Sequence, residues 1–132
     1  YTPIMGALSD AEHACAVTAD SKYCSKEEIR EQTLEEASKL EVDDRITVLF
    51  EKDRSCLSKS DIVTNSGFVR PITREMISYI KSTAVIPLMW SANELRPEEL
   101  DLQACREKGI VVLGTNENHP KLNLLASSGF KI

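Results

Sequence analysis

The fold is decided by residues 61–117, DIVTNSGFVRPITREMISYIKSTAVIPLMWSANELRPEELDLQACREKGIVVLGTNE. Three short apolar runs, each a candidate strand, begin near Ile62, Val85 and Ile110. Two stretches with helical spacing separate these runs, and the second stops at Gly109, a residue suited to the left-handed end of a helix. Strands that alternate with helices predict a parallel α/β sheet. A ligand is expected in the polar loops, because parallel sheets bind ligands outside the carboxyl ends of their strands.

The residues before this stretch supply two further strands and one long helix. We expect strands at 14–18 and 45–50, and the second of them is rich in β-branched residues. Between them, Ser25 and Glu28 match a capping box, in which two side chains satisfy backbone N–H groups at the start of a helix. The expected helices are 25–40, 71–82 with Met76, Ile77 and Ile80 facing inward, 97–108, and a last one from Pro120 to Gly129.

Five strands and about four helices therefore make up the expected domain. Residues 1–12 are expected to form an arm or short cap, and no regular element is predicted for 51–60. Residues 13–132 form a single domain by length. Right-handed crossovers would place helices on both faces of the sheet. The predicted fold is a flavodoxin-like three-layer sandwich with a five-stranded parallel sheet in the order 2-1-3-4-5.

Charge and composition argue against several classes of partner. The chain has 16 basic and 21 acidic residues and a net charge of −5, which is the wrong sign for nucleic acid or an anionic membrane surface. No apolar run approaches the ~20 residues that cross a bilayer. The two histidines are far apart and have no cysteine at ligand spacing, so no metal site is predicted. Buried thiols in a reducing cytoplasm are expected for the four cysteines, Cys15, Cys24, Cys56 and Cys105.

Familiar catalytic signatures are missing. The sequence has no G-x-G-x-x-G, no phosphate-binding loop and no G-x-S-x-G elbow. His119 lies near the carboxyl end of the last strand, but a helix cap or an exposed side chain is the favoured interpretation. Small-residue turns remain, at 66–67 and 91–93. Small side chains let a ligand reach main-chain N–H groups, which can hold a carboxylate, although tight turns between strands and helices also favour small residues.

Two segments resemble the D-isomer-specific 2-hydroxyacid dehydrogenases. In residues 61–73 a strand ends in an Asn-Ser-small turn before a Thr-capped helix. In residues 85–112 a strand and turn lead to Leu-Asp-Leu, an alanine-containing helix and Gly-Ile-Val-Val. The resemblance is to the N-terminal part of that family's substrate domain. It implies that backbone amides bind a small 2-hydroxy or 2-keto acid. The turn of Asn65, Ser66 and Gly67 would border this substrate, and the main chain of Ser91, Ala92 and Asn93 would hydrogen-bond its carboxylate.

The same resemblance limits the expected activity. The family's glycine-rich NAD motif and its catalytic Arg, Glu and His belong to an inserted domain, and none of them can be mapped onto this chain. NAD is implied for a full-length relative, whereas no cofactor and no catalytic residue are expected here, and the chain alone should be inactive. We expect a cytoplasmic domain that binds a small carboxylate and can form a homodimer. The alternative is a non-catalytic regulatory or protein-interaction module on the same fold.

Overall fold

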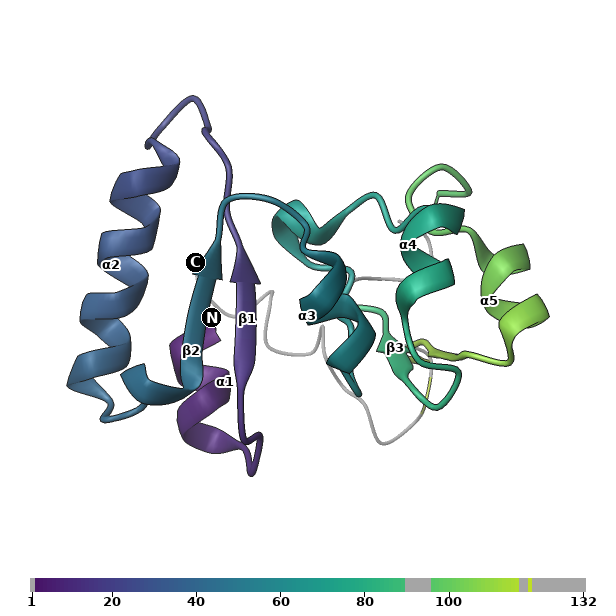
Figure 1. Cartoon of the computed structure of the whole chain (residues 1–132), viewed down its shortest axis with the longest axis horizontal. Coiled ribbons are helices and arrows are strands. Elements are labelled where there is room, and N and C mark those ends of the chain that lie inside the picture. Colours follow the sequence, from purple (N-terminus) through teal and green to yellow (C-terminus); the bar gives the residue numbers. More distant parts are fainter. Residues whose placement is uncertain (1, 90–95, 117–118, 120–132) are drawn as a thin grey trace. The chain divides into compact units, whose positions relative to one another are not determined.

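The computed structural model describes residues 2–89, 96–116 and 119. These residues alternate helices with parallel strands, as predicted (Figure 1). The strands are β1 (Ala14–Val17), β2 (Ile46–Leu49), β3 (Val85–Pro87) and β4 (Val111–Leu113). The helices are α1 (Thr2–Leu8), α2 (Lys26–Lys39), α3 (Arg54–Lys59), α4 (Arg74–Tyr79) and α5 (Leu102–Lys108), with short 3-10 helices η1 (Asp43–Arg45) and η2 (Gly67–Val69). No helix in these ranges is long and apolar enough to span a membrane.

The chain divides into two compact units. The first contains residues 1–59 and 67–69, and the second contains 60–66 and 70–132. The single domain expected over 13–132 stays a prediction. The last predicted helix, which would begin at Pro120, lies outside the described residues.

The sheet differs from the predicted one. Within the described ranges, the strands form two two-stranded parallel sheets, β1–β2 and β3–β4, in place of one five-stranded sheet. The strand predicted at Asp61 is reduced to a parallel bridge between Ile62 and Val85. Its pairing is short because only Ile62 and Val63 are apolar before polar residues follow.

The first unit is a β1–α2–β2 crossover. Ala37 at the end of α2 packs with Val42 and Ile46 in a buried cluster, and the half-buried Ala14 and Val48 join it from the two strands. Helix α2 therefore lies along the β1–β2 pair (Figure 1). This is the covering helix that the sequence predicts between two parallel strands.

Helix α1 occupies the segment that was expected to be an arm or short cap. Gly6 of α1 is buried, and a Cβ atom at this position would meet Cδ1 of Ile46 at 3.1 Å. The missing side chain thus lets α1 pack closely against the core of the first unit. Within residues 2–8, Pro3 and Gly6 are buried.

The capping box predicted at the start of α2 is confirmed. Ser25 Oγ accepts a hydrogen bond from the Glu28 amide at 3.2 Å, and the Glu28 carboxylate accepts one from the Ser25 amide at 2.8 Å. The predicted pair of Glu35 and Lys39 is also present, at 2.9 Å. Hydrogen bonds from Ser25 hold the pKa of Glu28 below its usual value. The stabilisation from this carboxylate is therefore present above the ordinary pKa and is lost as the pH falls through the lowered one.

We expect Ser25→Ala to lower the free energy of unfolding by about 1 kcal/mol, because the first turn of α2 loses its side-chain cap. Urea denaturation monitored by circular dichroism measures the change. The same substitution at Ser38, an exposed residue in the last turn of the same helix, is the control and should change stability by less than ~0.5 kcal/mol. Equal losses at both positions would contradict the capping role of Ser25.

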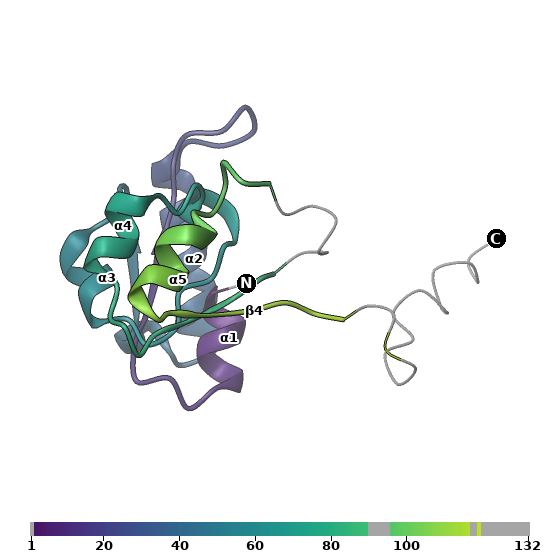
Figure 2. The same ribbon diagram turned by 90° about the vertical axis from the view of Figure 1, so that its right-hand side faces the viewer.

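The second unit buries the apolar face predicted for α4. Met76, Ile77 and Ile80 are buried, together with Ile86 in the middle of β3. The predicted left-handed residue that ends α5 is also confirmed, because Gly109 has φ 77°. Figure 2 shows β4 following α5 in this unit.

Helix α5 begins later than predicted. Pro97 and the acidic residues after it indicated a start near residue 97, but a parallel bridge between Ile72 and Leu100 holds this segment extended. The Asp101 amide donates to the Ile72 carbonyl at 3.2 Å, and the Asp101 side chain then caps α5 by accepting from the Ala104 amide at 2.8 Å. Tertiary pairing here outweighs the local helix signal.

Helix α4 ends at Tyr79, earlier than the predicted Ser82. A lysine from α5 satisfies the carbonyl groups at this end. Lys108 Nζ donates to the carbonyls of Ile77 and Ser78 at 2.8 and 2.6 Å. A positive charge is favourable at a helix C-terminus, where the helix dipole is negative. The contact therefore both ends α4 and ties it to α5.

Helix α3 lies where no regular element was predicted. Asp53 Oδ2 accepts a hydrogen bond from the Cys56 amide at 2.7 Å, and the Leu57 amide donates to the Asp53 carbonyl at 3.0 Å. Asp53 therefore acts as a helix cap. The segment was missed because it is short and polar and has no acidic residue three positions after the cap.

The burial of the four cysteines differs from the prediction that all four thiols are buried. Only Cys105 is buried, whereas Cys24 and Cys56 are half-buried and Cys15 is exposed. Ala14 packs on the core of the first unit. Successive side chains of a strand point to opposite faces, so Cys15 points away from that core.

Candidate functional site

The structure describes three of the six predicted site residues. Asn65 is fully buried, whereas Ser66 and Gly67 are exposed. Asn65 and Ser66 belong to the second unit, and Gly67 groups with the first as the start of η2. The other predicted turn, Ser91, Ala92 and Asn93, lies outside the described residues. The expected meeting of the two turns therefore stays a prediction.

Asn65 follows the carboxyl end of a short parallel segment. Val63 donates to the Val85 carbonyl at 3.0 Å, which sets residues 61–63 beside β3. The side chain of Asn65 then reaches the chain that leaves β3, because its Oδ1 accepts a hydrogen bond from the Met89 amide at 2.7 Å. Asn65 and Met89 thus mark the carboxyl ends of two neighbouring parallel segments, which is where α/β sheets bind ligands.

The carboxamide nitrogen of Asn65 is the unusual atom of this arrangement. Nδ2 has no hydrogen-bond acceptor within the part of the chain that the structure describes, and the residue is 0% exposed. A buried donor without an acceptor costs about 1–3 kcal/mol, and buried polar groups in native proteins are nearly always paired. With Oδ1 held by Met89, the amide group can still donate to an incoming oxygen atom.

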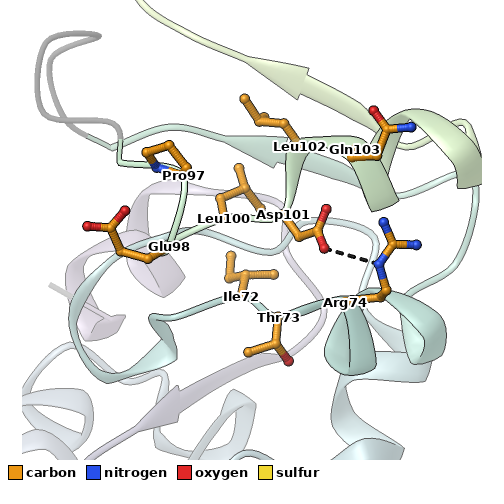
Figure 3. A pocket seen from close by; sticks show the side chains of 9 residues that line it. All are labelled: Ile72, Thr73, Arg74, Pro97, Glu98, Leu100, Asp101, Leu102 and Gln103. Atoms are coloured by element: carbon orange, nitrogen blue, oxygen red, sulfur yellow. Dashed lines mark hydrogen bonds and ion pairs between the residues drawn. The ribbon is translucent and has the colours of Figure 1, made fainter.

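An open depression of about 480 Å³ lies in the second unit but does not include Asn65 (Figure 3). Ile72 and Leu100 provide apolar side chains, and those of Arg74 and Asp101 point toward one another (Figure 3). Arg74 Nε lies 3.2 Å from the Asp101 carboxylate, and its Nη1 lies 2.6 Å from that of Glu107. The hydrogen bond from Arg74 lowers the pKa of Glu107. The ion pairs of Arg74 connect α4 to α5. The packing of these two helices therefore accounts for the depression.

Neither histidine forms a catalytic arrangement in the described ranges. His119 is exposed, as one of the two favoured interpretations predicted, and its backbone amide donates to the Asn116 carbonyl at 3.0 Å. His13 Nε2 lies 2.9 Å from Thr47 Oγ1 in the first unit. Among residues 2–89, 96–116 and 119, no three His, Cys, Asp or Glu side chains are grouped so that they could hold a metal ion.

Thr18 is a buried polar residue that the sequence did not single out. It follows β1, its amide donates to the Leu49 carbonyl at 2.9 Å, and its Oγ1 has no hydrogen-bond partner within the described ranges. The only sequence signal was a threonine at the end of an apolar run. The hydroxyl group of Thr18 indicates a ligand less strongly than the side-chain amide of Asn65, because the hydroxyl is a single donor that can rotate.

The connection from β1 to α2 does not fit a dinucleotide cofactor. A dinucleotide cradle needs a glycine-rich turn between a strand and a helix, where the main chain approaches the pyrophosphate. The connection from β1 to α2 contains no glycine, because residues 18–25 read TADSKYCS. We therefore assign no step to NAD in this chain.

Comparison of the chain with protein-family models, curated proteins and solved structures gives no match. The resemblance to 2-hydroxyacid dehydrogenases therefore rests on the motifs in residues 61–112 alone. Among the three predicted site residues that the structure describes, Asn65 alone is buried, and its unused donor makes it the strongest candidate for ligand contact.

Proposed function

We propose that the second unit binds a small carboxylate of the 2-hydroxy or 2-keto acid class and that Asn65 contacts it. The observation that carries the proposal is the buried Nδ2 of Asn65, which has no acceptor in the described part of the chain. An oxygen atom of the acid would accept its hydrogen bonds, while Oδ1 stays bonded to the Met89 amide. The motif resemblance supplies the acid class, and the amides of Ser66 and of residues 91–93 complete the set of donors in this proposal.

The flavodoxin-like sheet is part of the same proposal. The order 2-1-3-4-5 counts the five predicted strands, so residues 61–63 are the third, β3 is the fourth and β4 is the fifth. In this order β2 pairs with β1, residues 61–63 lie beside β3, and β3 pairs with β4. Each of these neighbours is present and parallel within its own unit. The five-stranded arrangement would place the loops that follow the strands at one edge, where a carboxylate could meet amides from two of them.

The proposed role is binding and orientation of the acid. A side-chain amide fixed at its oxygen presents its N–H groups in one direction, which selects an acceptor of matching geometry. Hydride transfer would need the cofactor domain of a full-length relative, where NAD accepts or supplies the hydride. This chain on its own is proposed to be inactive.

A second candidate function is an interaction module, and exposed apolar side chains favour it. Val111 and Leu113 alternate along β4, so they point to one face, and they are 51% and 54% exposed. Met89 after β3 and Ile62 beside it are also exposed. Such a face can mark a site of protein contact. The occupant in this second proposal is another copy of the chain.

An NMR titration of the ¹⁵N-labelled chain with pyruvate and D-lactate tests the first proposal. We expect the side-chain NH₂ signals of Asn65 and the backbone amide of Ser66 to shift in a saturable way, because these groups would donate to the acid. Acetamide, which has no carboxylate, is the control ligand and should leave both signals unchanged. Shifts confined to other residues, or none at millimolar acid, would end the proposal.

Spectra of the same labelled chain also separate the two candidate functions. Two spectra recorded without ligand, at two protein concentrations, should be identical if the chain binds acids and does not associate. Concentration-dependent shifts at Val111 and Leu113, with Asn65 unaffected by pyruvate, would favour the interaction module.

A further inference from the structure

Strand β2 has one paired edge and one free edge. Within the described residues, β2 pairs in parallel with β1 alone (Figure 1). The Thr18 amide donates to the Leu49 carbonyl at 2.9 Å, so Leu49 directs its main-chain polar groups toward β1. Successive residues of a strand direct these groups to opposite sides. Val48 therefore presents its N–H and C=O groups to the free edge.

The free edge of β2 lacks the features that usually prevent an edge from pairing. Natural edge strands carry charges, prolines or bulges that block a further strand. Residues 46–50 read ITVLF, with no charge and no proline, and Phe50 is 39% exposed. An open depression of about 460 Å³ lies at the end of the strand, lined by Lys26, Val48, Leu49, Phe50, Glu51 and Asp53. The edge is therefore a template for another strand.

We propose that the free edge of β2 pairs in antiparallel fashion with the same edge of a second copy of the chain. The two-fold axis passes beside Val48, so the two Val48 residues lie opposite each other. Each N–H group of this pair donates to the other carbonyl, as in a hydrogen-bonded antiparallel pair. At either end, the Phe50 amide of one copy donates to the Ile46 carbonyl of the other. The Ile46 amide is not needed, because it already donates to the Asp43 carbonyl.

The charges beside β2 favour a second copy as the partner and select this register. With the axis at Val48, Arg45 of each copy lies opposite Glu51 of the other. One position further out, Asp44 lies opposite Lys52. Opposite charges that face each other across two strands stabilise the pairing, and like charges weaken it.

A neighbouring register loses this match. If the axis passed beside Thr47, Asp43 of one copy would lie opposite Glu51 of the other, and two negative charges would face each other. The depression at the end of β2 is lined in part by Glu51. In the proposed register it would receive the Arg45 side chain of the second copy.

The proposed pairing is self-limiting. Both copies use the same edge, so their association closes at a dimer and leaves no β2 edge for a third chain. The product is a four-stranded sheet in the order β1–β2–β2–β1, with the α2 helix of both copies on one face. The few hydrogen bonds make it a weak interface that forms at high protein concentration. It belongs to the first unit and depends neither on Asn65 nor on the exposed side chains of β4.

The first experiment measures association and locates it. Sedimentation equilibrium of the full chain, from micromolar to millimolar concentration, should give a mass that rises toward twice that of one chain and no further. Hydrogen exchange followed by NMR should show that the Val48 amide becomes protected as the concentration rises, whereas the Leu49 amide, which faces β1, is protected throughout. A monomer at millimolar concentration would overturn the proposal. So would association that shifts Val111 and Leu113 and leaves the Val48 amide unprotected.

Charge variants test the register. Glu51→Arg should weaken dimerisation on the order of tenfold, because two attractive pairs become repulsive. Adding Arg45→Glu reverses both charges and should restore the wild-type affinity. Glu12→Arg makes the same change in net charge at an exposed residue before β1 and is the control, which should dimerise like the wild type. Undiminished association of Glu51→Arg, or no recovery in a folded double variant, would overturn the proposed register.

Circular dichroism checks the fold of these variants, because Arg45 also donates to the Ala11 carbonyl at 3.2 Å. If the double variant does not fold, Glu51→Arg and the exchange of the Val48 amide in the wild type still decide between the two outcomes.

Discussion

Asn65→Asp should abolish binding of 2-keto acids and lower the free energy of unfolding by about 2–4 kcal/mol. The substitution keeps an oxygen atom for the Met89 amide but replaces the donating NH₂ group by an acceptor. It also places a negative charge at a position that is 0% exposed. A bound carboxylate would then face another carboxylate instead of a donor. Calorimetric titration with pyruvate and urea denaturation measure the two effects.

The pH dependence of this variant separates the charge from a packing defect. Burial raises the pKa of a carboxyl group, so the folded variant favours the protonated form. The loss of stability should therefore be small below about pH 4, where an unfolded aspartate is also protonated, and should grow as the pH rises. The same substitution at the exposed Asn116 is the control and should change stability by less than ~0.5 kcal/mol. Unchanged affinity for pyruvate in Asn65→Asp would show that Asn65 does not contact the acid.

Ile86→Ala should destabilise the protein by about 2–5 kcal/mol, because it removes a buried side chain and leaves a cavity. Ile86 is 0% exposed in the middle of β3. Urea denaturation measures the loss. Ile62→Ala is the matched control, since Ile62 is 65% exposed, and it should cost less than ~1 kcal/mol. Similar losses for the two variants would contradict the burial assigned to β3.

The parts of the fold that could be predicted are those whose signal is local and repeated. Ser25 and Glu28 form the expected capping box, because both partners lie within one helical turn. The inward face of α4 was also predictable, since Met76, Ile77 and Ile80 repeat at helical spacing. In both cases the residues that determine the structure are close neighbours in the sequence.

The parts that were missed depend on distant partners. The start of α5 is set by the bridge from Leu100 to Ile72. Ile72 is too far from Pro97 in the sequence for a local pattern to reveal this pairing. The end of α4 depends on Lys108, a residue of another helix. The five-stranded sheet was expected from the alternation of apolar runs, but alternation does not fix how many residues of each run find a paired neighbour.

The candidate site was predicted only in part for the same reason. The sequence placed Asn65 in a turn after a strand and assigned ligand contacts to main-chain amides. It could not show that the side chain itself is buried, because this depends on the Met89 amide that holds Oδ1. An asparagine in a turn most often bonds its own backbone a few residues away, so the long-range bond and the unused Nδ2 became apparent only in three dimensions.

The β1–α2–β2 crossover has a consequence for how the protein is made. Its buried cluster of Ala37, Val42 and Ile46, with Ala14 and Val48, draws only on residues 14–48. Parallel pairing of Ala14 with Ile46 closes a long loop, so this step is slow compared with forming the helix between them. We expect a nascent chain to assemble this segment during synthesis, before Ile86 and the rest of the second core have left the ribosome. The bridge from Ile72 to Leu100 cannot form until later, so the pairing that precedes α5 would be completed after the first unit.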